Sequence, residues 1–196
     1  MLELVQKLDD DMMIDAESGE KLANRLASYE DKLYHDALTG ALNRRYYEEH
    51  MRKTVYEAGI AMIDVDNFKL YNDVFGHRAG DVVLETMAQS VKLHTASGDL
   101  LVRLGGDEFL LLFYGYETRE ALRTDIKKLE ENFAQSSAAL PDGKRLCIRM
   151  SGGVAWYPED ALDLETLKKY ADFAMYEVKH STKGEVRELS LIHISE

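Results

Sequence analysis

The stretch LLVRLGGDEFLLLF, residues 100 to 113, constrains the fold of this chain more than any other part of it. Its two apolar runs are long enough to form buried strands, and Gly105 and Gly106 between them predict a tight hairpin turn. Asp107 and Glu108 follow at the bend. These adjacent acids are either a solvated hairpin tip or part of a site, and both interpretations are open on this stretch alone.

The segments around this hairpin predict an α+β fold. AGIAMIDVD indicates a buried strand, and two helical segments follow it, NFKLYNDVFG and AGDVVLETMAQSVKLH, with Gly76 and Gly80 marking a turn between them. After the hairpin we expect a helix over residues 117 to 137, a strand in RLCIRMSGGVAWY and a helix in LDLETLKKYADFAMYEVKHS. This order is the βαββαβ core of ferredoxin-like folds, an antiparallel sheet with helices on one face.

The chain divides into three regions: an N-terminal helix over residues 1–33, a main domain over residues 34–190 and a tail over residues 191–196. The first region has apolar residues at coiled-coil spacing, interrupted by Asp15 and Gly19. The seam consists of Val5, Leu8, Met12, Leu22, Leu26, Tyr29 and Leu33. A signalling coiled coil and an amphipathic helix folded back on its own domain both fit this pattern. The tail is interpreted as a final edge strand or a non-native end.

Composition narrows the function classes. The formal net charge is 24 minus 36, or -12, which argues against binding long nucleic acid, because that needs a basic face. A small anionic ligand bound through metal ions is compatible with this charge. Cys147 is the only cysteine, and the N-terminus lacks the pattern of a secretory signal. No apolar run approaches the ~20 residues of a membrane span. We expect a cytoplasmic domain whose longer parent protein carries a sensor module upstream of Met1.

Asp64 ends the first predicted strand of the main domain, and that strand and the hairpin are expected to be neighbours at the centre of the sheet. Asp64, Asp107 and Glu108 would then converge within a few ångströms. Like charges that close do not all stay ionised unless a cation lies among them. Two divalent ions about 3.5–4 Å apart, shared with substrate phosphates, would resolve this conflict and suit the oxygen ligands of Mg²⁺.

Five fragments in order resemble one known family. RLGGDEF is similar to the signature of the GGDEF family, the diguanylate cyclases. DALTGALNRRYY, DVDNFKLYNDVFGHRAGD, SGGVAWYPED and ADFAMYEVKHSTKG resemble its other motifs. The match runs from Asp36 to Gly184, roughly three quarters of the chain. Each fragment is weak evidence by itself, but their shared order and spacing make the resemblance specific.

The resemblance implies a polymerase-palm-like fold that condenses two GTP into cyclic di-GMP and pyrophosphate, with two Mg²⁺ per site and Mn²⁺ as a possible substitute. Asp64 and Asp107 would ligate the metal, assisted by the carbonyl of Val65. Glu108 would be a further ligand or the base for the attacking hydroxyl, and the sequence does not separate these roles. Each subunit would hold one GTP, so that activity needs a homodimer, with the N-terminal helix as the element that controls its geometry.

The resemblance also assigns a nucleotide site. Asn72 and Asp81 would read the guanine edge, because an amide and a carboxylate together match its donors and acceptors. The alternative for Asp81 is that it only caps the helix that begins with it. Residues near the start of the preceding helix, and basic residues expected around the triphosphate, complete the set: Asn67, Phe68, Lys69, Lys179 and Lys183. Gly105 and Gly106 would let the backbone approach the nucleotide.

One motif departs from the family. Many members carry an inhibitory product site, Arg-x-x-Asp, shortly before the signature, and here that window is ASGD. Asp99 is present, but Ala96 stands in place of the arginine. Without a guanidinium fork the bidentate grip on product is lost, so we predict weak or absent feedback inhibition by this route.

Two other functions compete with the enzyme. A catalytically idle domain of this family would bind GTP or cyclic di-GMP and regulate a partner. A dimerisation or signalling module would depend mainly on the N-terminal helix. The complete set of Asp64, Asp107, Glu108, Asn72 and Asp81 favours the enzyme.

Overall fold

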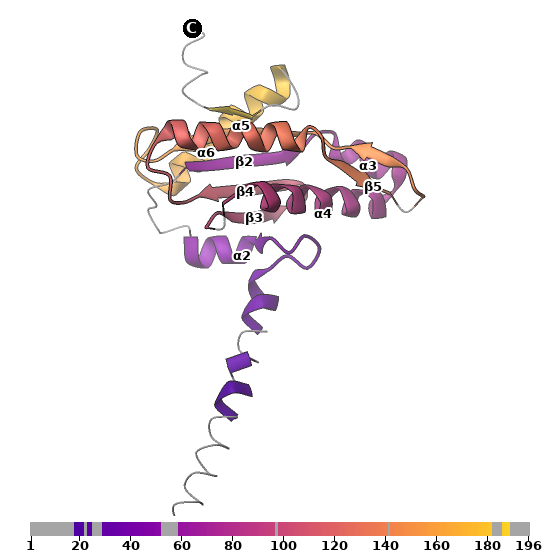
Figure 1. The fold of residues 1–196 in the computed structure, drawn as a ribbon, viewed down its shortest axis with the longest axis horizontal. Helices are drawn as coiled ribbons and strands as arrows, with labels where there is room; N and C mark the ends of the chain where they lie inside the picture. The colour runs from indigo at the N-terminus through magenta and orange to yellow at the C-terminus, as the bar shows by residue number, and fades with distance from the viewer. Residues whose placement is uncertain are drawn as a thin grey trace, which may run out of the picture.

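The protein is described by a computed structural model over residues 18–21, 23–24, 29–51, 59–96, 98–140, 142–181 and 186–188. A six-stranded sheet with the order β1-β3-β4-β2-β7-β8 forms its centre (Figure 1). Its strands are β1 (Leu42–Asn43), β2 (Gly59–Val65), β3 (Leu100–Gly105), β4 (Glu108–Phe113), β7 (Met150–Trp156) and β8 (Val186–Glu188). The helical elements are α2 (Arg44–Tyr46), the π-helical turn η1 (Tyr47–Met51), α3 (Phe68–Phe75), α4 (His77–His94), α5 (Arg119–Phe133) and α6 (Leu164–Ser181).

The centre of the sheet follows the predicted α+β plan. β2 lies between β4 and β7 and is antiparallel to both, so that Asp64 faces Glu108 on one side and Ser151 on the other. β3 and β4 form the predicted hairpin. The edge strands β1 and β8 are parallel to their neighbours β3 and β7. The prediction of a mainly antiparallel, palm-like sheet with helices is therefore confirmed.

Helices cover both faces of the sheet, so the expectation that they lie on one face is wrong. Ala61 and Ile63 of β2 share a hydrophobic core with α4 and α5, which lie on the near side of the sheet in Figure 1. Ile60 and Met62 belong to a separate core with η1 and α6. The physical reason is that both alternating sets of residues in β2 are apolar, and every residue of the strand is buried.

The predicted strand RLCIRMSGGVAWY is two strands in two sheets. β7 pairs with the whole length of β2, from Gly59 opposite Trp156 to Val65 opposite Met150. β2 ends at Val65, and the regular pairing with β7 stops one residue beyond it, where the backbone N–H of Asp66 donates to the carbonyl oxygen of Arg149 at 2.9 Å. β6 (Arg145–Cys147) pairs instead with β5 (Ser137–Ala139) in a separate two-stranded sheet.

α6 packs closely on β7 because Gly153 has no side chain. A Cβ at this position would overlap the carbonyl oxygen of Ala171 and the amide nitrogen of Met175, and would lie 2.8 Å from the Cβ of Ala174. Backbone atoms of a helix cannot move aside as a flexible side chain can. Gly153 therefore sets the distance between the sheet and α6, and with it the position of Lys179.

The described part of the N-terminal region, residues 18–21, 23–24 and 29–34, is helical and extends away from the sheet in Figure 1. Tyr29 is 62% exposed and Leu33 is 37% exposed, so these two seam residues do not fold back onto the domain. The other seam residues, Val5, Leu8, Met12, Leu22 and Leu26, lie outside the described residues, as does the tail 191–196. The division into a helix, a main domain and a tail remains a prediction.

Candidate active site

Asp64 is the acid on which the site is built. It lies near the end of β2, is almost fully buried, and its Oδ2 is 2.7 Å from the ammonium nitrogen of Lys179 on α6. Burial, the largest cause, and the nearby charges of Asp107 and Glu108 raise the pKa of Asp64, while the hydrogen bond and charge of Lys179 oppose the rise. The net result is a pKa of about 6. The two acids of the hairpin thus act electrostatically on Asp64, as the predicted register requires.

The carboxylates do not form a ready-made metal cluster. Among the residues that the structure describes, no three His, Cys, Asp or Glu side chains lie together as metal ligands. Asp64 instead forms an ion pair with Lys179. Asp107 lies in the hairpin turn, and Glu108 is the first residue of β4. Asp64, Asp107 and Glu108 therefore do not converge as the sequence predicted, although the charges of Asp107 and Glu108 still raise the pKa of Asp64.

The residues nevertheless suit a hard divalent cation. All the acids offer oxygen ligands, which Mg²⁺ prefers, and they repel one another in the absence of positive charge. Asp66 supplies a further observation, because it is buried and its Oδ2 accepts no hydrogen bond from the described residues. Its Oδ1 accepts from the hydroxyl of Ser151 at 2.7 Å. Sequence reasoning missed this pair, because nothing in the sequence places Ser151 beside the turn after β2.

The turn after β2 leads directly into α3. Asn67 is the N-cap residue of α3 and has a left-handed backbone, with φ of 58°. The first N–H groups of a helix have no partner within it, so the backbone of Phe68 and Lys69 offers donors for an anion at this end. Lys69 itself is exposed. The predicted helix start is confirmed, and phosphate binding there remains a prediction.

Asn72 and Asp81 lie on neighbouring helices. The Asn72 side chain contacts Gly80 so closely that a Cβ on Gly80 would overlap its Oδ1. Gly80 therefore lies inside α4 and not in the predicted turn, which is made by Gly76 with φ of 82°. Asp81 is exposed and follows Gly80 within α4. The alternative that Asp81 only caps the helix is wrong, because α4 begins at His77.

His77, which the GHRAG segment contributes, is exposed at the start of α4.

Arg103 of β3 holds the hairpin turn by hydrogen bonds to its backbone. Its Nε and Nη2 donate to the carbonyl oxygen of Gly106 at 3.1 and 2.8 Å, and its Nη1 pairs with Oδ1 of Asp36 at 2.9 Å. Asp36 also accepts from the backbone N–H and the hydroxyl of Thr39, at 2.9 and 2.7 Å. Burial opposes ionisation of Asp36, yet these hydrogen bonds hold its pKa below the ordinary value. Gly106 adopts φ of 56°, as the predicted tight turn requires.

The Asp36–Arg103 pair was not predicted from the sequence, although both residues belong to motifs that the sequence singles out. Asn43 of β1, which pairs with Arg103, holds the end of the N-terminal helix, because its Nδ2 donates to the carbonyl oxygens of Leu33 and His35 at 2.8 and 3.3 Å. The helix and the turn that carries Asp107 are thus joined by a short series of polar contacts.

Asp99 has a structural use in this chain. Its Oδ2 accepts the backbone N–H of Ala96 at 2.9 Å, and its Oδ1 accepts that of Tyr114 at 3.0 Å. Both oxygens are therefore occupied by backbone, which agrees with the idea that the degenerate motif no longer grips product. Weak feedback inhibition remains a prediction. Lys183 lies outside the described residues, so its predicted place beside the triphosphate is not tested.

The comparisons with known proteins agree with this geometry. The family model described as diguanylate cyclase, GGDEF domain, matches residues 33–185. The chain belongs to the GGDEF domain family. A solved structure of the isolated GGDEF domain of TpbB from Pseudomonas aeruginosa superposes with a TM-score of 0.74 and 30% identity, covering 83% of this chain and 99% of that one.

Curated relatives of this GGDEF domain include diguanylate cyclases. TpbB from Pseudomonas aeruginosa is 33% identical over 177 residues, which cover 85% of this chain and 40% of TpbB. Diguanylate cyclase A from Treponema denticola is 31% identical over 155 residues, which cover 79% of this chain and 41% of that protein. The chain thus spans less than half the length of these relatives. No helix among the described residues is long and apolar enough to cross a membrane.

Proposed function

We propose that this GGDEF domain is a diguanylate cyclase that condenses two GTP into cyclic di-GMP and two pyrophosphates. The observation that carries the proposal is the buried Asp64, whose pKa of about 6 reflects its burial and its proximity to Asp107 and Glu108 across the sheet. A buried acid in a group of like charges is costly for stability, and such groups are typical of sites that bind a cation. The named relatives supply the substrate class.

Asp64, Asp107 and the carbonyl of Val65 would hold divalent metal, with Glu108 as a further ligand or as a base. Bound Mg²⁺ or Mn²⁺ would lower the pKa of the attacking hydroxyl and neutralise charge on the leaving group. The ammonium of Lys179 lies 2.7 Å from Asp64 and offsets part of the negative charge of these acids. We infer that it would also bind a triphosphate oxygen of GTP.

The nucleotide extends from these acids towards α3 and α4. The N-terminal N–H groups of α3, with Asn67, Phe68 and Lys69, face the phosphates, and Asn72 and Asp81 read the guanine edge. Gly106 keeps the hairpin backbone close to the phosphates, and Arg103 holds that turn through its carbonyl oxygen. Lys183 would add a further positive charge.

In each condensation the 3′-oxygen of one GTP forms a bond to the α-phosphorus of the other. The bond between the α-phosphorus and the bridging oxygen to the β-phosphate breaks, and pyrophosphate leaves with the electron pair. The hydroxyl proton passes to Glu108 or to water. One domain offers one nucleotide site, so two copies must face each other, and the reaction repeated in the opposite sense closes the ring.

Incubation of the full chain with Mg²⁺ and GTP, followed by chromatography and mass spectrometry, tests this function. We expect cyclic di-GMP and pyrophosphate from the native chain and neither from Asp107→Asn. Tight GTP binding without turnover would support the idle regulatory domain instead. Neither binding nor turnover would favour a dimerisation module. Because the relatives are longer, we also propose that the natural parent protein carries a sensor module.

A further inference from the structure

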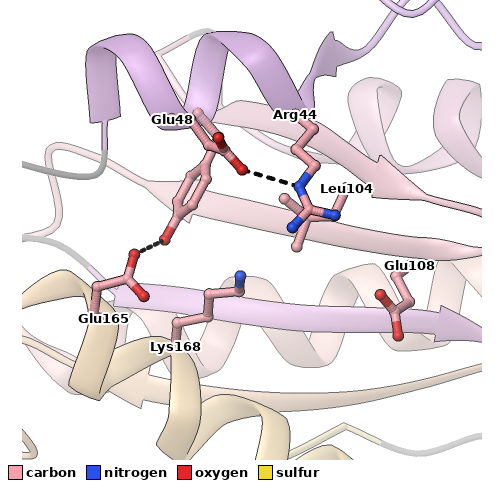
Figure 2. Close-up of a pocket in the computed structure, with 7 residues that line it drawn as sticks. Arg44, Glu48, Leu104, Glu108, Glu165 and Lys168 are labelled. Carbon is pink, nitrogen blue, oxygen red and sulfur yellow. Dashed lines mark hydrogen bonds and ion pairs between the residues drawn. The ribbon is translucent and has the colours of Figure 1, made fainter.

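A pocket of about 210 Å³ adjoins Glu108 on the face of the sheet that α6 covers. Its walls come from α2, η1, the end of β3 and the first turns of α6 (Figure 2). Arg44 and Lys168 contribute positive charge to it, and Glu108 stands at one end. The roles proposed above use none of this pocket except Glu108.

Lys168 is the unusual residue of this pocket. Its ammonium lies 5.0 Å from the ring centroid of Tyr47, which is buried and donates its hydroxyl to Oε1 of Glu165 at 2.9 Å. Arg44, by contrast, is paired through Nε with Glu48 at 3.0 Å. Within the described ranges Lys168 makes no ion pair. A fixed aromatic ring thus holds the ammonium in the pocket without neutralising its charge.

Lys168 is separate from the Asp64 site although both involve α6. Lys168 and Lys179 are eleven positions apart on this helix, which corresponds to about 16 Å along its axis. The Nζ of Lys179 forms an ion pair with Oδ2 of Asp64 at 2.7 Å. Lys168 is therefore too far along α6 to take part in the ion pair between Asp64 and Lys179. The pocket that Lys168 lines nevertheless includes Glu108.

The size of the pocket limits what it binds. Sites that hold a whole small-molecule ligand usually enclose ~300–1,000 Å³, so a pocket of about 210 Å³ suits one part of a ligand that is held elsewhere. A carboxylate and an unpaired ammonium in one small space match a group that presents a hydroxyl beside a phosphate. The ribose of a nucleoside 5′-triphosphate has this chemistry, because the same sugar carries the 3′-hydroxyl and the 5′-phosphates.

We propose that this pocket is an acceptor subsite, in which Lys168 and Glu108 receive the ribose 3′ end of the nucleotide held by a second copy of the chain. This inference rests on the proposed function, which requires a hydroxyl delivered from outside the domain's own nucleotide site. Lys168 binds a phosphate oxygen of the incoming nucleotide, and this contact keeps its 3′-hydroxyl beside Glu108. Lys168 makes no contact with the nucleotide that its own domain binds.

The test compares Lys168→Met, Lys168→Arg and the control Lys169→Met in the full chain. Methionine keeps most of the length of the stem beside Tyr47 and removes the charge, and Lys169 is an exposed neighbour on the same helix outside the pocket. Two quantities are measured: cyclic di-GMP formation at saturating Mg²⁺ and GTP, and the Kd of 3′-deoxy-GTP, which binds but lacks the attacking hydroxyl. Thermal unfolding monitors folding of each variant.

We expect Lys168→Met to reduce turnover by about tenfold, the usual scale for one charge-assisted contact, with an unchanged Kd for 3′-deoxy-GTP. Lys168→Arg should recover most of the turnover, and Lys169→Met should match the native chain. Native turnover in Lys168→Met would overturn the subsite. A parallel loss of 3′-deoxy-GTP binding would also overturn it, because Lys168 would then serve its own domain's nucleotide. If the native chain binds 3′-deoxy-GTP but forms no product from GTP, the proposed function itself fails and the subsite with it.

Discussion

Replacing Asp64 with asparagine should stabilise the protein without metal while it abolishes activity. The pKa of Asp64 is raised from 3.8 to about 6, mainly by burial. At about 1.4 kcal/mol per pKa unit this corresponds to roughly 3 kcal/mol of cost for the ionised acid. Solvent reaches part of the site and screens the charges, so we take about 1–2 kcal/mol as the realistic gain. In a domain of this size that raises Tm by about 3–6 °C.

The sign of the pH dependence follows from linkage. A carboxyl whose folded pKa is raised contributes stability that is fully present below its ordinary value of 3.8 and is lost as the pH rises through about 6. The Asp64→Asn variant escapes this loss, so its advantage should be present at pH 8 and absent near pH 4.

Thermal unfolding in EDTA at both pH values measures this difference. Asp172→Asn is a suitable control, since Asp172 is an exposed carboxylate on α6. Addition of Mg²⁺ should raise the Tm of the native chain at pH 8 and leave that of Asp64→Asn nearly unchanged. A variant that is less stable than the native chain at pH 8, or a difference that does not change with pH, would refute the reasoning.

Four further outcomes are expected. Gly153→Ala should lower the free energy of unfolding, measured by chemical denaturation, by about 3 kcal/mol, because the added Cβ would overlap the backbone of α6. The control Gly98→Ala should leave the free energy of unfolding nearly unchanged, because Gly98 has open space around it. Asp36→Asn should lower Tm by a few degrees and reduce cyclic di-GMP formation, because Arg103, which binds the hairpin turn, loses its ion pair with Asp36. Native activity in this variant would contradict a role of the Asp36–Arg103 pair in holding the turn. Removal of residues 1–33 should lower specific activity at low protein concentration, and equal activity over a dilution series would exclude the N-terminal helix as a control element. Cyclic di-GMP at micromolar concentration should not inhibit the enzyme, and inhibition that disappears in Asp99→Ala would show that the degenerate product site still works.

The parts of the fold that were predictable depend on local patterns. The apolar runs flanking Gly105 and Gly106 gave the hairpin, and the strand that ends at Asp64 was placed beside it correctly. The helices on the second face of the sheet were not predicted. The sequence indicated them, because apolar residues stand at both alternating sets of positions in β2. The break before Met150 depends on where β2 ends, which the segment RLCIRMSGGVAWY does not encode.

The candidate site was predictable as a set of residue types but not as a geometry. Sequence motifs identified Asp64, Asp107 and Glu108, and their electrostatic coupling follows from strand register. The pairing of Asp64 with Lys179 depends on how closely α6 approaches the sheet, which Gly153 decides. Such long-range contacts join segments far apart in the chain, and no local pattern in either segment reveals them.

Asp64 near the end of β2 and Asp107 in the turn between β3 and β4 are proposed to bind divalent metal together. Calorimetric titration of Mn²⁺ into the full chain, saturated with 3′-deoxy-GTP, measures this directly. We predict two ions per chain, with affinity reduced at least about tenfold in both Asp64→Asn and Asp107→Asn. Native affinity in either variant, or no saturable metal binding in the native chain, would contradict the account.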